Sequence, residues 1–353
     1  MIVSAGPGRG PLAAVAVGAA AARFRRARGV ARSAAGAAVV ALLVTGLSVM
    51  GLSGCATDAS AGRFIGPSAS AQPHSAAPHS TAPNAEPWLL EARRTGGPGK
   101  GVWTSMTLPG RRTGYQLPAQ VYVPDAYFDP QQPGRRFPVV LLLAGFPGAI
   151  EHWDTQGHVL PILDRMMAEQ KIPPMILVSP SQNPEPDRDS ECIDAVGGAR
   201  ADTYLSQDVP EAIAAHLRVT QDRAGWSAMG YSTGGYCAVD LALRHPERFA
   251  SAVSLDGYFA PAIDNTTGDL FKGDAAAERS YTPTRIVRDQ RPAALRFYLV
   301  AGTTEAKVRS EARAFAAAVH APDTATVVEV PGGHNWDTWN RAMPGALTWL
   351  SAS

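Results

Sequence analysis

The sequence predicts an α/β domain in which a mostly parallel central sheet is covered by helices on both faces. Two observations predict this class. Short continuous apolar runs, such as 137–143 and 175–178, are typical of strands buried on both faces of a parallel sheet. Such runs alternate with segments of helical periodicity, and this alternation indicates parallel strands joined by helical crossovers.

The predicted elements follow one another from residue 114 to the C-terminus. The expected strands are 114–123, 137–143, 175–178, 225–229, 250–255, 295–300 and 325–330. The expected helices are 208–217, 235–244, 308–319 and 338–350. Residues 261–292 interrupt this alternation, and there we expect a loop-rich excursion over the functional site.

The composition excludes several functional classes. A chain of 353 residues with 45% hydrophobic residues can form a substantial core. The formal net charge of +1 argues against nucleic acid as a partner, because phosphate binding needs a clustered basic surface. Three cysteines are too few for a disulfide scaffold and lack zinc-site spacing, so we expect neither a metal nor a cofactor.

Residues 1–55 have the features of an export signal. The basic segment 23–28 is followed by an apolar run, 34–52, and then by Leu52-Ser53-Gly54-Cys55. These four residues resemble the bacterial lipobox, in which the cysteine carries lipid and becomes the first mature residue. We therefore expect an exported protein, either anchored to the cell membrane through Cys55 or secreted.

A transmembrane anchor is the alternative for this segment, since the apolar run approaches the roughly 20 residues that span a bilayer. Both alternatives place the remaining chain outside the cytoplasm. The stretch before Arg23 is long for a signal, which leaves a translation start downstream of Met1 open. Residues 56–86 are rich in Ala, Ser and Pro and predict a flexible tether, and 87–353 form the expected catalytic domain.

A candidate nucleophile lies between the strand 225–229 and the helix 235–244. There the letters GYSTGG, residues 230–235, contain the G-x-S-x-G nucleophile elbow of the α/β-hydrolase fold. The turn lifts the Ser232 hydroxyl out at the carboxyl edge of the sheet, and small neighbours let the strand and the helix approach. An inert glycine-rich turn is the alternative, which the flanking strand and helix disfavour.

A serine hydroxyl needs a base and an acid to act as a nucleophile at neutral pH. His334 is the candidate base because it sits on a loop directly after the last strand, although a helix-capping histidine is the alternative. Glu305 is the favoured acid because it follows the strand 295–300. Glu311 on the next helix and Asp256 after the strand 250–255 remain alternatives.

An oxyanion hole requires two convergent backbone N–H groups. Thr233, the residue after the nucleophile, is expected to supply the first. The second is expected from the loop 144–148, where Pro147 has no N–H and Phe146 is therefore the candidate donor. A plain turn is the alternative for this loop, since it is rich in Gly and Pro.

These segments together resemble the putative-esterase family of α/β-hydrolases, which includes esterase D, bacterial feruloyl esterases and the mycobacterial mycolyltransferases. The resemblance runs from about residue 114 to the C-terminus and is most specific in the letters GYSTGG, HPERF, SLDGY and GGHNW. It implies a serine–histidine–acid triad. In many members the acid is an Asp after Gly-x-x, the position of Glu305, whereas the mycolyltransferases use a Glu on the following helix, which keeps Glu311 open.

The expected activity is hydrolysis of a carboxylic ester through an acyl-enzyme. Acyl transfer to a sugar or lipid acceptor is an alternative that the mycolyltransferase resemblance implies. A catalytically inactive surface-binding protein on the same scaffold is another. The expected partners are a small-molecule, lipid or sugar ester and, through the anchor, a membrane. Relatives often have His-Gly where this chain has Ala144-Gly145, which leaves the substrate contacts of that loop open.

Two cysteines remain once Cys55 is assigned to lipid. An oxidising compartment favours one bridge between Cys192 and Cys237. Such a bridge would tie the loop 179–198 to the nucleophile elbow at the carboxyl edge of the sheet. Two separate buried thiols are the alternative, because free cysteine packs well as a small apolar side chain.

Overall fold

The computed structural model describes residues 86–96 and 100–352. All described residues belong to one compact unit. The predicted signal 1–55, Cys55 and all but the last residue of the tether 56–86 thus lie outside the described residues. Among the helices that are described, none is long and apolar enough to cross a membrane.

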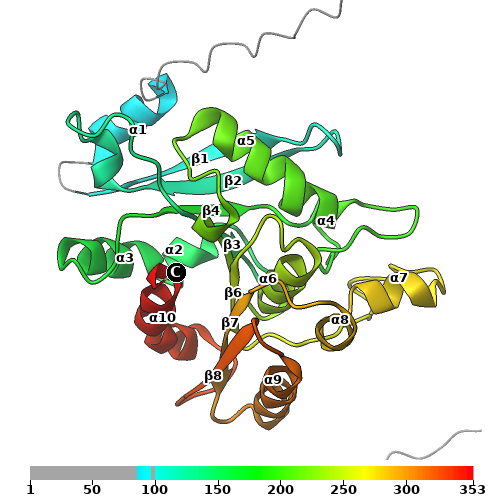
Figure 1. The fold of residues 1–353 in the computed structure, drawn as a ribbon. Helices are drawn as coiled ribbons and strands as arrows, with labels where there is room; N and C mark the ends of the chain where they lie inside the picture. Colours follow the sequence, from blue (N-terminus) through cyan, green and yellow to red (C-terminus); the bar gives the residue numbers. More distant parts are fainter. Residues whose placement is uncertain (1–85, 97–99, 353) are drawn as a thin grey trace, which may run out of the picture. The chain divides into compact units, whose positions relative to one another are not determined.

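A single sheet of eight strands forms the centre of the described domain (Figure 1). The strands are β1 (Val102–Pro109), β2 (Gln116–Val123), β3 (Val139–Leu143), β4 (Ile176–Pro180), β5 (Trp226–Tyr231), β6 (Ser251–Leu255), β7 (Arg296–Gly302) and β8 (Thr324–Val330). Their order is β1-β2-β4-β3-β5-β6-β7-β8. The pairs β1–β2 and β2–β4 are antiparallel, and all other pairs are parallel. The mostly parallel sheet confirms the predicted fold class.

Helices cover both faces of the sheet, as predicted. They are α1 (Pro87–Gly96), α2 (His152–Thr155), α3 (Val159–Ala168), α4 (Ala201–Thr203), α5 (Val209–His216), α6 (Thr233–Arg244), α7 (Ala275–Ser280), α8 (Pro283–Asp289), α9 (Ala306–Ala318) and α10 (Trp336–Ser351). Figure 1 shows α3 and α10 on one face and α5, α6 and α9 on the other. Each face has its own apolar core, and β3 contributes alternate residues to both cores.

All predicted strands and helices are present, with their ends shifted by a few residues at most. Strand β1 was not predicted, because its alternation of buried and exposed residues is irregular. The segment 261–292 is loop-rich as expected, but it also contains two short helices that were not predicted, α7 and α8. Both helices span about two turns or fewer, which is too short for a clear periodic pattern. Their start signals are nevertheless in the sequence: the Asp274 side chain caps α7, and Pro283 opens α8.

The register of the parallel strands brings five strand ends to one edge of the sheet. The paired residues nearest that edge are Leu143 with Gly230, Tyr231 with Leu255, Leu255 with Val300, and Gly302 with Val330. The residues that follow β3, β5, β6, β7 and β8 therefore emerge side by side. In open α/β sheets this carboxyl edge is where ligands bind.

Candidate active site

Ser232 lies in the sharp turn that joins β5 to α6. Its backbone has φ 56° and ψ −123°, a conformation that an L-residue adopts only under strain. The Ser232 N–H donates to the carbonyl of Leu255 on β6 at 2.9 Å, which fixes the turn to the sheet. This is the turn at which the sequence predicts a nucleophile elbow.

The two glycines that flank Ser232 are required by close backbone contacts. A Cβ on Gly230 would lie 1.9 Å from the carbonyl oxygen of Gly234. A Cβ on Gly234 would lie 2.1 Å from the carbonyl oxygen of Leu143 at the end of β3. Since neither backbone oxygen can move aside, any larger residue at these positions would separate the strand from the helix.

His334 lies on the loop between β8 and α10, at the same edge of the sheet. Hydrogen bonds from Thr303 N to Val330 O and from Thr304 N to Gly332 O, both 2.9 Å, join this loop to the turn after β7. The imidazole is exposed to solvent and contacts the ring of Trp339 edge-on, with 5.2 Å between ring centroids. His334 is thus accessible, as a catalytic base must be.

All three candidate acids lie near His334. Glu305 is half-buried directly before α9, and its Oε1 lies 3.1 Å from where a Cβ on Gly333 would be. Asp256 is buried; Oδ1 accepts from Gly302 N and Oδ2 from Trp339 Nε1, each at 2.7 Å. Glu311, on α9, lines the same pocket as His334 and pairs with Lys307 at 3.5 Å.

Burial raises the pKa of Asp256, while hydrogen bonds from Gly302 and Trp339 and the charge of His334 lower it. The structure therefore places a second carboxyl beside the histidine, apart from Glu305. Within the described residues, no hydrogen bond joins His334 to Ser232 or to any of the three carboxyls; those of Asp256 go to Gly302 and Trp339. Such catalytic bonds are often long in the absence of substrate and tighten when it binds.

The two expected oxyanion donors lie on either side of Ser232. Thr233 is the first residue of α6, where a helix leaves its N–H groups without an intrahelical acceptor. The loop with Phe146 follows β3 and packs directly on the nucleophile, because a Cβ on Gly145 would lie 2.9 Å from the Cβ of Ser232. Both segments meet at Ser232, as the expected oxyanion hole requires.

A pocket of about 470 Å³ opens beside His334 and Asp256. The segment from Tyr258 to Ala262, after β6, forms an apolar wall, and Val308 on α9 faces it. Lys307 and Glu311 add charge at the α9 side. Nowhere in the described part of the chain do three or more His, Cys, Asp or Glu side chains gather where they could hold a metal ion.

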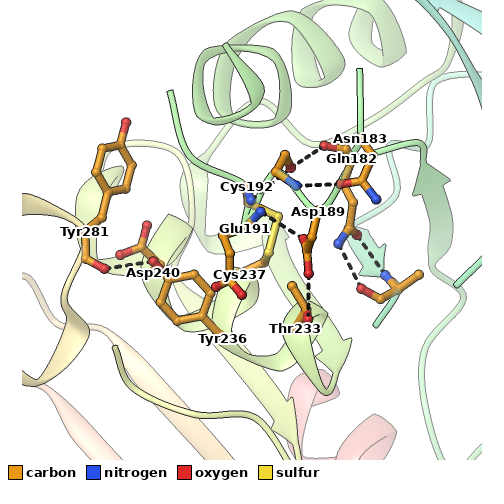
Figure 2. The surroundings of a disulfide bond; sticks show 12 residues. Gln182, Asn183, Asp189, Glu191, Cys192, Thr233, Tyr236, Cys237, Asp240 and Tyr281 are labelled. Atoms are coloured by element: carbon orange, nitrogen blue, oxygen red, sulfur yellow. Dashed lines mark hydrogen bonds between the residues drawn. A yellow bond between two sulfur atoms is a disulfide. The ribbon is translucent and has the colours of Figure 1, made fainter. Parts of the chain in front are cut away.

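Cys192 and Cys237 form a disulfide in the structure, with 5.7 Å between their Cα atoms. It joins the loop after β4 to α6, as the sequence analysis expects. Figure 2 shows Asp189, Glu191 and Thr233 around this bond.

The sequence analysis did not single out four polar residues next to the elbow: Gln182, Asp189, Glu191 and Tyr258. The Tyr258 hydroxyl donates to Glu191 Oε1 at 2.5 Å, and the same oxygen lies 3.2 Å from Thr233 Oγ1. Asp189 Oδ2 accepts from the Thr233 hydroxyl at 3.2 Å. These contacts join distant segments, and no local pattern in the sequence predicts them.

Solved structures share this architecture. The chain aligns with a ferulic acid esterase at a TM-score of 0.60 and 20% identity, over 72% of this chain and 98% of that one. An S-formylglutathione hydrolase from Agrobacterium tumefaciens aligns at a TM-score of 0.60 and 19% identity, over 72% and 96%. Similarity at this level of identity establishes the fold, which is that of the α/β-hydrolases.

Sequence relatives cover shorter parts. An uncharacterized protein of Corynebacterium glutamicum is 27% identical over 66% of this chain and 56% of its own length. The MPT51 antigen of Mycobacterium leprae is 32% identical over 38% of this chain and 42% of its own. The chain thus spans about half the length of the curated relatives it matches. Residues 110–350, well over half of the chain, match the model of the putative esterase family, and the chain belongs to that family.

Proposed function

We propose that this chain is a serine hydrolase that cleaves carboxylic esters through an acyl-enzyme intermediate. Ser232 is the nucleophile, His334 the general base and Glu305 the acid of the triad. The observation that carries the proposal is the strained backbone of Ser232, with φ 56°, at the junction of β5 and α6. This junction lies at the sheet edge that also carries His334.

In the first half-reaction, Ser232 Oγ attacks the carbonyl carbon of the ester while His334 takes the hydroxyl proton. The N–H groups of Thr233 and Phe146 stabilise the negative oxygen of the tetrahedral intermediate. His334 then gives the proton to the departing alcohol, and the acyl group stays on Ser232. Water, activated by the same imidazole, releases the carboxylic acid. Glu305 keeps the imidazole oriented and stabilises its charged form.

The proposal is tested with Ser232→Ala and an ester panel on the mature domain. The variant should lose on the order of 10⁴- to 10⁶-fold in kcat, as removal of a triad member does. A fluorophosphonate should label wild-type protein at Ser232, and Ser310→Ala, which changes an exposed serine on α9, should label normally. Absence of labelling in folded wild-type protein would favour a surface-binding protein without activity.

Acyl transfer to a sugar or lipid hydroxyl is the second candidate, because it shares the first half-reaction. The pocket beside His334 favours it, since an acceptor alcohol there would meet the base that must deprotonate it. Single-turnover experiments with an acylated enzyme separate the two functions. Faster deacylation by a sugar than by water would establish the transferase, and deacylation that sugars leave unchanged would establish the esterase.

Export and lipid anchoring through Cys55 complete the proposal. The disulfide between Cys192 and Cys237 supports an oxidising compartment, because such bonds are rare in reducing cytosol. The signal-like residues 1–55 support the same location.

A further inference from the structure

The loop after β4 contacts the oxyanion loop through one buried side chain. Gln182 Oε1 accepts from the N–H of Ala144 at 2.9 Å, and Gln182 Nε2 donates to the carbonyl of the same residue at 2.8 Å. Strands β3 and β4 pair in parallel up to Leu141 and Val178. The side-chain amide of Gln182 therefore takes the place of a further backbone pair between the two strands. It does so at Ala144, the first residue after β3 and the start of the loop with Phe146.

The same loop contacts the other half of the oxyanion hole through Asp189. Its Oδ2 accepts from the hydroxyl of Thr233 at 3.2 Å, and its Oδ1 accepts from Glu191 N at 2.9 Å. Asp189 and Thr233 are both buried. Figure 2 shows the Asp189 carboxyl directed at Thr233, which follows the nucleophile.

Three further contacts restrain this loop: one disulfide and two hydrogen bonds. The disulfide from Cys192 ties its end to α6, and the Ser190 hydroxyl donates to Gln182 O at 2.7 Å. Asn183 Oδ1 accepts from Ser190 N at 3.0 Å, which closes the loop on itself. A single closed loop thus contacts Ala144 through Gln182 and Thr233 through Asp189. Figure 2 shows Gln182, Asp189 and Thr233 in this arrangement.

An oxyanion hole is effective only when its two donors lie about 2.7 to 3.1 Å from the developing oxyanion. Here the donors belong to segments far apart in the sequence, after β3 and after β5. A displacement of about 1 Å in a catalytic group can cost about 100-fold in rate. Side chains that fix the distance between these two segments are therefore expected to affect the catalytic rate.

We propose that Gln182 and Asp189 are positioning residues that set the spacing of the oxyanion hole, Gln182 through Ala144 and Asp189 through Thr233. The inference rests on the proposed function, because it assumes that Ser232 forms a tetrahedral intermediate. Neither residue touches the reacting atoms. Gln182 acts through Ala144, two residues before the proposed donor Phe146, and Asp189 acts through the side chain of Thr233, whose N–H is the other proposed donor.

The test uses Gln182→Met, which keeps the length of the side chain without its amide, and Asp189→Ala. Each should lower kcat and kcat/KM together by about 10- to 100-fold with KM nearly unchanged, as expected when only the transition state loses stabilisation. Rates are divided by the concentration of active sites from fluorophosphonate titration, which removes any effect of misfolded protein. Affinity for an alkylboronic acid, which forms a tetrahedral adduct on serine, should fall by the same factor.

Conservative variants and a residue outside this loop provide the controls. Asp189→Asn keeps an acceptor for the Thr233 hydroxyl and should restore most of the rate. Gln132→Ala removes a hydrogen bond to Asp129 Oδ2 in an exposed turn before β3, outside this loop, and should leave kcat per active site unchanged. If Gln182→Met does not fold, Gln182→Glu, which keeps the acceptor and loses the donor, takes its place.

A double-variant cycle tests whether Asp189 acts through the hydroxyl of Thr233. Thr233→Val keeps the backbone N–H and removes the hydroxyl that Asp189 contacts, so its loss and that of Asp189→Ala should not add. Additive losses, or boronate affinity unchanged in Gln182→Met and Asp189→Ala, would overturn the inference while leaving the proposed function standing. Wild-type protein that is folded but unlabelled would overturn both.

Discussion

The strained backbone of Ser232 destabilises the folded state by on the order of 1–3 kcal/mol. The surrounding contacts hold it there: the bond to Leu255, and the two glycines that no other residue can replace without displacing Gly234 or Leu143. At this scale the sequence was most informative. A short motif with strict steric demands specifies its own geometry, and the structure has that geometry.

Two substitutions that remove charge and preserve size test whether Glu305 or Asp256 is the acid of the proposed triad. Glu305→Gln should lower kcat/KM by at least 100-fold, because the imidazolium loses its counter-charge. Asp256→Asn should have a smaller effect on the rate, since the hydrogen bonds of Asp256 go to Gly302 and Trp339. Steady-state kinetics on both variants checks this, and the reverse order would assign the acid's role to Asp256.

Glu191 makes stability depend on pH. Burial, and next the charges of Asp189 and Asp264, raise its pKa to about 8, although the hydrogen bond from Tyr258 opposes this. The folded state therefore keeps a proton that the unfolded chain has lost above its ordinary pKa of about 4.3. The contribution of Glu191 to stability should be complete below that value and be lost as the pH rises to about 8.

The measurement for Glu191 is the free energy of unfolding in urea at pH 5, 7 and 9. Glu191→Gln should gain stability relative to wild type as the pH rises across this range. Glu211→Gln is the control, because Arg112 lowers the pKa of that carboxyl and its titration falls below the range. A constant difference between wild type and Glu191→Gln would contradict the expectation.

At the scale of elements, the disulfide is the strongest single restraint between two segments. Cys192 and Cys237 are 45 residues apart in sequence. A loop of this size should contribute about 4 kcal/mol through the lost entropy of the unfolded chain. In urea unfolding, the double variant Cys192→Ser, Cys237→Ser should have a free energy of unfolding about 4 kcal/mol below that of wild type. Cys55→Ser is the control and should have the same free energy of unfolding as wild type. Equal stability of the double variant would show that packing alone holds the loop.

Strands and helices with strong periodicity could be predicted from the sequence, and so could the loop between β4 and α4 with its disulfide, but the hydrogen bonds of that loop could not. Its contacts come from Gln182 and Asp189, whose partners Ala144 and Thr233 lie far away in the chain. The neighbouring sequence does not distinguish a glutamine whose amide bonds a strand's backbone, as that of Gln182 does, from one that faces solvent. The triad acid was left open for a related reason: three carboxyls reach the same histidine only after β6, β7 and β8 have been aligned.

At the scale of the whole molecule, the export hypothesis concerns residues outside the described part. Cys55→Ser should release the protein from the membrane fraction, because a lipid-modified cysteine is the proposed anchor. Fractionation of cells that express each form, with mass spectrometry of the N-terminus, checks this. An unmodified Cys55, or a variant that stays in the membrane fraction, would contradict the anchor and favour the transmembrane alternative.

Helix α6 is buried from Thr233 to Leu243, enclosed by the sheet and its neighbours. Backbone amides in such a position exchange with solvent only when the entire domain opens. The proposed nucleophile, Ser232, therefore directly precedes a helix whose amides should be among the slowest to exchange in the described part of the chain. In the pocket wall, Tyr258 contacts this helix, because its ring stacks on Tyr236 with 5.2 Å between ring centroids. Ala260 and Ala262 in the same wall are exposed and can vary in sequence without disturbing that helix. Substitutions in the exposed part of the wall can therefore change the shape of the pocket while Ser232 and α6 keep their positions.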